Sequence, residues 1–224
     1  LTETVPVAGA TLAPDGDALA VCACGPDDDF EIGSISKPVT AMLYADAIDR
    51  GEVRPEQRLE EWLDLGGTAA GRVTLASLST HTSGLPRLPK GLAISGSVDL
   101  LVHGRNPYTA TLPQLLAQAA ATPVGKPKPA YSNLGYQLLG HAISVAAGTT
   151  YPQLVRTRFA EPLHLDPFHV PSSPGDLRPG SIAGVSRRGA PRDPWADAVL
   201  GPAGGIRASI RAMSRFARAI LDGS

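Results

Sequence analysis

The sequence predicts a mixed α/β (α+β) fold, with antiparallel strands at the start of the chain and a series of helices after them. An Asp-Gly pair at 15–16 separates two apolar runs, which is typical of a β-hairpin. Further along, apolar residues recur at helical spacing in segments that proline and glycine punctuate. Because the chain has 224 residues, 43% of them hydrophobic, it can bury a sizeable core in one large domain or in two small lobes.

The first elements follow from local signals. Strands are expected at 4–12 and 18–24 on either side of the turn. A buried helix is expected to run to Arg50 and to end at Gly51, a good C-cap residue. Pro38 is tolerated only in a first turn, where backbone N–H groups have no helical partner. This helix therefore begins close to Ser34.

The remaining elements are expected to be mostly helical. Helices are predicted at 59–65, 74–80, 112–121, 133–147 and 151–159, and an amphipathic helix at 209–221. Irregular structure is predicted at 85–106, 123–129 and 171–202.

Composition excludes several classes of protein. Lysine and arginine number 20 against 21 acidic residues, with no basic stripe, so no nucleic-acid partner is expected. No apolar run approaches the roughly 20 residues that cross a bilayer, and residues 1–10 lack the features of a signal peptide. Cys22 and Cys24 have no cluster of histidine or cysteine around them, so no metal site is expected.

A candidate nucleophile lies in Ser34-Ile35-Ser36-Lys37. Residues three apart at a helix start share one face, so the lysine can reach the serine. A buried lysine that is neutral part of the time can take the serine proton, and the field of the helix N-terminus favours negative charge there. The structural alternative is a capping serine with a solvated lysine. A Ser-His-Asp triad is disfavoured because no Gly-x-Ser-x-Gly elbow occurs.

A second candidate is Tyr131-Ser132-Asn133, between a proline-rich loop and a predicted helix. A tyrosine hydroxyl can pass a proton, and an asparagine amide can hold a substrate amide. The structural alternative is that Asn133 caps the helix while Tyr131 packs on the loop.

These two motifs, with the segments 78–86 and 202–206, resemble the serine β-lactamase and penicillin-binding protein family. Within that family the chain is similar to the class C β-lactamase-like branch of D-alanyl-D-alanine carboxypeptidases and esterases. The resemblance implies that Ser34 is the acylated nucleophile and Lys37 its base. It also implies that Tyr131 passes the proton of the leaving group and that Asn133 binds the substrate amide. His81, in the segment 78–86, is expected to be structural.

The resemblance also implies an architecture and a class of substrate. An α/β lobe is expected from 1–52 and 172–224, and a helical insertion from 53–171, with the site between them. The expected reaction is acyl transfer from an amide, ester or lactam of small-molecule or peptide-like kind, with no cofactor. Secretion is common in that family, which favours an extracytoplasmic location, although cytosolic members exist.

One departure from the family pattern affects the expected activity. The family has a third motif, a Lys or His two residues before a glycine, on a strand beyond the segment that matches 202–206. Neither Lys-x-Gly nor His-x-Gly occurs here, and Arg187-Arg188-Gly189 lies too early. The C-terminal strands of the family are therefore expected to be missing. The alternative to an active hydrolase is a non-catalytic or incomplete chain that needs a second chain or segment to form its site.

Overall fold

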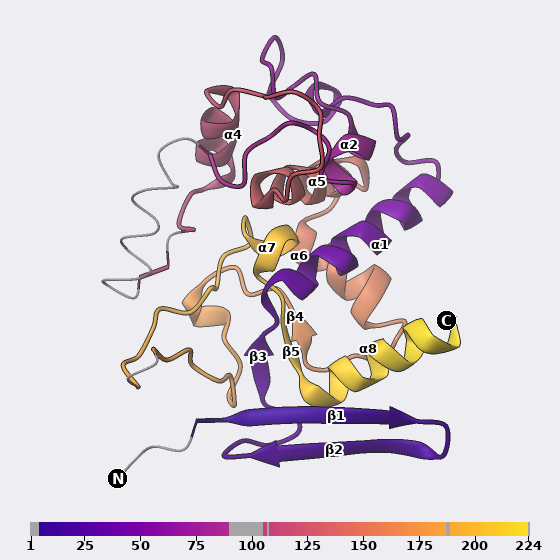
Figure 1. The fold of residues 1–224 in the computed structure, drawn as a ribbon, viewed down its shortest axis with the longest axis vertical. Helices are drawn as coiled ribbons and strands as arrows, with labels where there is room; N and C mark the ends of the chain where they lie inside the picture. Colours follow the sequence, from indigo (N-terminus) through magenta and orange to yellow (C-terminus); the bar gives the residue numbers. More distant parts are fainter. Residues whose placement is uncertain (1–4, 90–104, 107, 187–188, 224) are drawn as a thin grey trace.

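The computed structural model describes residues 5–89, 105–106, 108–186 and 189–223. Its first element is the predicted hairpin, formed by β1 (Val7–Ala13) and β2 (Gly16–Cys22). The strands pair antiparallel, with a register that runs from Val7 opposite Cys22 to Ala13 opposite Gly16. The hairpin lies along one end of the molecule, next to α8 (Ile210–Asp222) (Figure 1). The hairpin prediction is confirmed, with a tighter turn than expected.

A second antiparallel sheet joins three segments that are far apart in the sequence. It contains β3 (Asp29–Glu31), β5 (Arg207–Ser209) and β4 (Phe168–His169) in that order, so β5 is the central strand. Each strand has only two or three residues, which is too short to show an alternating pattern. No sequence pattern therefore predicts this sheet. β4 lies in the expected helical insertion, 53–171, although it pairs with β5 of the expected α/β lobe. The boundaries of the two lobes stay a prediction.

The predicted buried helix is α1 (Ser36–Asp49), preceded by a 3-10 turn over Gly33–Ile35. Pro38 lies in the first turn of α1, as its missing N–H requires. Gly33 has a φ of +54°, a conformation that glycine adopts without the cost other residues incur. The strand-to-helix turn therefore depends on Gly33 and brings Ser34 to the start of the helical stretch.

The other helices are mostly where the periodicity predicts them. They are α2 (Leu75–Ser79), α4 (Leu112–Ala120), α5 (Asn133–Ala146), α6 (Tyr151–Val155), α7 (Gly201–Gly204) and α8, with a π turn over Arg156–Ala160. The prediction of a helix over 59–65 is wrong in extent, because only a 3-10 turn forms there, at Leu59–Glu61. Where it is described, the segment 171–202 is irregular apart from a 3-10 turn at Pro174–Asp176, a β-bridge between Val185 and Pro191, and the start of α7. Most of the predicted loop at 85–106 lies outside the described residues.

Helix α5 organises the core. It is buried along most of its length and packs against α1, α2 and α7 (Figure 1). The mixed α/β fold class is thus confirmed, with antiparallel sheets and helices around one core. Within the described ranges no helix combines the length and hydropathy needed to cross a bilayer.

Substituting Gly140 is expected to separate α5 from α7. A Cβ atom at Gly140 would lie 2.3 Å from both Cβ and Cγ of Pro202, which is far inside van der Waals contact. Overpacking of this kind costs about 1–3 kcal/mol. Gly140→Ala is therefore expected to lower the free energy of unfolding by that amount in urea titrations. Gly9→Ala is the control, because nothing lies within 4 Å of its added Cβ. Equal stability of the two variants would contradict this packing.

Candidate active site

Ser34 is the exposed candidate nucleophile of the site. Its side chain is exposed, in the 3-10 turn that continues into α1. Ser36, two residues on, is fully buried, and its Oγ accepts a hydrogen bond from the backbone N–H of Ile206. Of these two serines, only Ser34 is thus open to a substrate.

Lys37 lies one turn further along, beneath Ser34. Its Nζ donates to Ser34 Oγ at 3.2 Å and also to the backbone carbonyl of Ala203 in α7. The side chain is only 4% exposed, and no carboxylate is among its hydrogen-bond partners in the described chain. Burial lowers the pKa of Lys37, against a smaller opposing contribution from Tyr131. The solvated lysine of the structural alternative is therefore wrong.

Tyr131 reaches the same serine from the loop before α5. Its hydroxyl donates to Ser34 Oγ at 2.6 Å, and Lys37 Nζ lies 4.7 Å from the centroid of its ring. Burial raises the pKa of Tyr131, but hydrogen bonds with Lys37 and Ser34 and the nearby positive charge outweigh it, so the pKa is lowered overall. The serine hydroxyl is therefore contacted by an amine and a phenol, both of which lose a proton more readily than in water.

Asn133 is the first residue of α5, but it does not cap the helix. The N-cap is Ser132, whose Oγ accepts from Gly135 N at 2.9 Å, so the alternative with Asn133 as the cap is wrong. The amide Nδ2 of Asn133 instead donates to Tyr108 Oη at 3.1 Å. Its Oδ1 is buried and has no hydrogen-bond partner among the described residues. This oxygen is therefore available to an N–H donor.

The structure places further residues near the candidate site. The Arg87 guanidinium lies 5.5 Å from the centroid of the Tyr131 ring. Tyr108, which contacts Asn133, packs edge-on against Trp195 with ring centroids 5.5 Å apart. None of the three belongs to a periodic segment or a motif, so only tertiary structure reveals that they lie near the candidate site.

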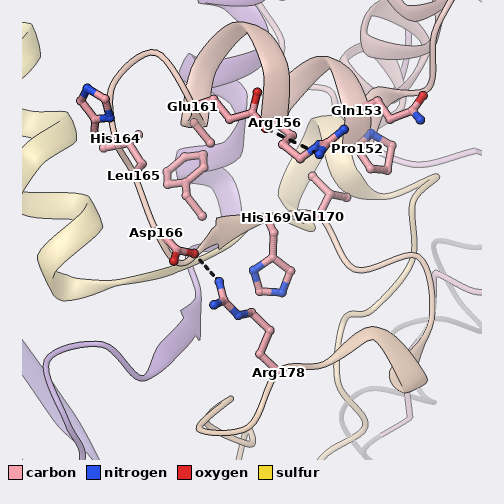
Figure 2. Close-up of a pocket in the computed structure, with 12 residues that line it drawn as sticks. Pro152, Gln153, Arg156, Glu161, His164, Leu165, Asp166, His169, Val170 and Arg178 are labelled. Atoms are coloured by element: carbon pink, nitrogen blue, oxygen red, sulfur yellow. Dashed lines mark hydrogen bonds and ion pairs between the residues drawn. The ribbon is translucent and has the colours of Figure 1, made fainter.

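A separate hollow of about 800 Å³ lies beside α6 and β4 (Figure 2). Charged side chains line it in pairs, with Arg178 bound to Asp166 and Arg156 3.6 Å from Glu161. Its described lining includes none of the four predicted site residues. The hollow is therefore distinct from the site at Ser34.

Hydrogen bonds join Ser34, Lys37 and Tyr131 directly, while Asn133 lies two residues beyond Tyr131 and is held by Tyr108. A hydroxyl flanked by two groups with lowered pKa values is an arrangement suited to nucleophilic acyl transfer.

In the part of the chain that the structure describes, no cluster of three or more His, Cys, Asp or Glu side chains could hold a metal ion.

The chain thus has a mixed α/β fold in which a lysine and a tyrosine contact one exposed serine, and comparisons identify its family. The model of the Beta-lactamase family matches residues 8–224, so the chain belongs to this family.

Similar curated proteins are considerably longer than this chain. A "Beta-lactamase" of Escherichia coli K12 is 27% identical over 193 residues, which cover 86% of this chain and 48% of the relative. The "D-alanyl-D-alanine-carboxypeptidase/endopeptidase AmpH" of the same organism is 31% identical over 158 residues, covering 68% of this chain and 39% of the relative. The chain thus matches about half the length of these relatives or less.

Solved structures agree on the fold. A class C β-lactamase from Rhodobacter sphaeroides superposes with a TM-score of 0.75 at 24% identity, over 96% of this chain and 60% of that one. A β-lactamase/D-alanine carboxypeptidase from Yersinia pestis superposes with a TM-score of 0.72 at 23% identity, over 93% and 61%. The predicted β-lactamase-like fold is confirmed.

Proposed function

We propose that the protein is a serine hydrolase or acyltransferase that works through an acyl-enzyme on Ser34. The observation that carries this proposal is the double contact on Ser34 Oγ, from Lys37 Nζ at 3.2 Å and from Tyr131 Oη at 2.6 Å. Membership of the Beta-lactamase family supports it independently. The substrate is an amide, ester or lactam of small-molecule or peptide-like kind.

In the first step Ser34 Oγ attacks the substrate carbonyl carbon, while Lys37, in its neutral form, takes the hydroxyl proton. The C–O bond to Ser34 forms, and the bond to the leaving group then breaks. Tyr131 passes the proton to the departing amine or alcohol, which leaves the acyl group on the serine. The start of the helical stretch at Ser34 favours negative charge near the serine and the carbonyl oxygen.

In the second step a water, amine or alcohol attacks the acyl-enzyme. Its proton moves to the neutral amine of Lys37, the bond between the acyl carbon and Ser34 Oγ breaks, and Lys37 returns the proton to Ser34 Oγ to restore the hydroxyl. Water yields hydrolysis and the other acceptors yield transfer. The free Oδ1 of Asn133 accepts a hydrogen bond from the amide N–H of the substrate, with Tyr108 fixing its orientation.

Intact-protein mass spectrometry tests the proposal. The chain is incubated with a penicillin and, separately, with an activated ester, and its mass is compared with that of untreated protein. We expect one covalent adduct, which tandem mass spectrometry of the 34–37 region assigns to Ser34 and not to the buried Ser36. An adduct on another residue would contradict the proposal. The reagent that reacts begins to define the leaving group.

The rate of acylation is expected to rise with pH, because the base must be neutral. The lowered pKa of Lys37 moves this rise below the value of 10.5 usual for lysine. Lys37→Ala is expected to reduce the rate by roughly 10²-fold or more, the range of a lost general base. Stopped-flow acylation from pH 5 to 10 measures both effects. Lys126→Ala, at an exposed lysine, is the control. An unchanged rate in Lys37→Ala would show that Lys37 is not the base.

We infer a second candidate function, in which the chain is incomplete and a further segment or a second chain completes its site. The hairpin is the observation that favours it. In the described chain β1 and β2 form a two-stranded sheet of their own, and Val7 and Val21 on them are 58% and 41% exposed. Two strands are marginally stable alone, and unpaired strand edges recruit other strands. Native mass spectrometry separates the candidates: a folded, monomeric 23.2 kDa chain that takes no acyl group favours the second.

A further inference from the structure

His81 holds the backbone on both sides of Tyr131. The N–H of Ala130 donates to the carbonyl oxygen of His81 at 2.8 Å. The N–H of Ser132 donates to His81 Nδ1 at 3.1 Å. The two backbone N–H groups that flank Tyr131 therefore both donate hydrogen bonds to His81, which lies about fifty residues earlier in the chain.

The imidazole ring of His81 also packs against the side chain of Tyr131. Its centroid lies 4.8 Å from that of Tyr131 and 4.7 Å from that of Tyr136 in α5. Tyr136 is itself fixed, since its hydroxyl donates to the backbone carbonyl of Ser79 at 2.8 Å. His81 adopts a φ of +58°, a conformation uncommon outside glycine, although histidine adopts it more often than most residues do. Such a backbone conformation persists where the surrounding contacts hold it in place.

The hydrogen bond from Ser132 requires one protonation state of His81. Nδ1 accepts this hydrogen bond, so it carries no hydrogen of its own, and the ring must be neutral with its hydrogen on Nε2. Burial first, and the positive charge of Lys37 second, lower the pKa of His81 below its usual value of 6.5. The titratable groups around the ring are Lys37 of α1, Tyr131, and Tyr136 of α5, with Arg87 beyond Tyr131. No carboxylate among them stabilises a charged imidazole.

We propose that His81 is the positioning residue of Tyr131, and that its neutral ring holds the phenol against Ser34 Oγ. This inference rests on the proposed function, because it concerns the proton relay of that reaction. Protonation turns Nδ1 from an acceptor into a donor, so the bond from Ser132 is lost. It also adds a second positive charge beside Lys37. The site therefore stops taking acyl groups when His81 is protonated.

Three variants separate this role from a purely structural one. His81→Asn keeps an acceptor, Oδ1, at the place of Nδ1, tolerates the positive φ, and has no titrating group. His81→Gly keeps the backbone conformation but has neither ring nor acceptor. His164→Gly is the matched control, because His164 is exposed, lies outside the site and has a φ of +53°. The measurement is the rate of Ser34 acylation by the activated ester from pH 4 to 9.

We expect His81→Gly to lower the rate by roughly 10²-fold, the effect of a misplaced catalytic group, and His81→Asn to recover most of the loss. In the wild type the logarithm of the rate should fall with a slope of one as the base is protonated. That slope should steepen to two below the pKa of His81. In His81→Asn it should stay at one. A wild-type profile that His81→Asn reproduces, or equal rates in His81→Gly and His164→Gly, would overturn the proposal.

A wild-type chain that takes no acyl group at all contradicts the proposed function but still leaves His81 testable. Hydrogen exchange then reads the two flanking amides directly. If His81 positions this segment, the amide of Ser132 exchanges faster in His81→Gly and faster in the wild type once His81 is protonated. Unchanged exchange in both cases would overturn the role of His81 on its own.

Discussion

Ser34→Ala is expected to abolish covalent labelling by both the penicillin and the activated ester. In the proposed reaction Ser34 Oγ is the atom to which the acyl group bonds, and neither Lys37 nor Tyr131 can substitute for it at the same position. Loss of a serine nucleophile costs about 10⁶-fold in a well-studied hydrolase, so no adduct should be seen on the time scale of the wild-type reaction. Mass spectra of both proteins after equal incubation measure the effect.

The fold of Ser34→Ala should be intact, which makes the result interpretable. Ser34 is exposed, and its partners Lys37 and Tyr131 retain their other contacts, to the Ala203 carbonyl and to His81. The free energy of unfolding is therefore expected to change by less than about 0.5 kcal/mol, as for other surface substitutions. An adduct on Ser34→Ala of the same mass and rate as on the wild type would show that another residue is the nucleophile.

The catalytic candidates were predictable because their chemistry is local. Ser34 and Lys37 are three residues apart, and Pro38, which follows Lys37 directly, marks the first turn of the helix. Helical geometry then brings the amine to the hydroxyl with no knowledge of the rest of the fold. The association of Tyr131 with them, by contrast, depended on the family resemblance, because 97 residues separate it from Ser34.

The features that no sequence pattern predicts depend on tertiary contacts. The strands β3, β4 and β5 are too short for a periodic pattern, and they pair because the helices bring them together. Tyr108 and Arg87 lie in loops, and nothing in their neighbours indicates what they contact. His81 was expected to be structural, and its bond to Ser132 emerges only when the segment 78–86 folds against the start of α5.

Substitution of Arg207 is expected to have the largest effect on stability. This arginine of β5 is 1% exposed, and its Nε donates to Asp29 Oδ1 at 2.6 Å, while Asp29 is also 1% exposed. Further bonds run to Glu31, at 3.3 Å, and to the carbonyl of Ile182, at 2.8 Å. Since β3, β5 and the segment around Ile182 meet at this side chain, the guanidinium links the small central sheet to the loop beside it.

Arg207→Met would leave the carboxylate of Asp29 buried without its cation. Breaking a buried pair from one side costs about 3–5 kcal/mol, whereas an exposed pair contributes at most about 1 kcal/mol. Arg211→Met is the matched control, because Arg211 pairs with Asp27 and both side chains are largely exposed. We expect urea unfolding to show a loss several times larger for Arg207→Met than for Arg211→Met. The double variant Arg207→Met/Asp29→Leu should recover part of it, because no buried charge then remains unpaired. Equal losses in the two single variants would mean that this ion pair does not hold the sheet together.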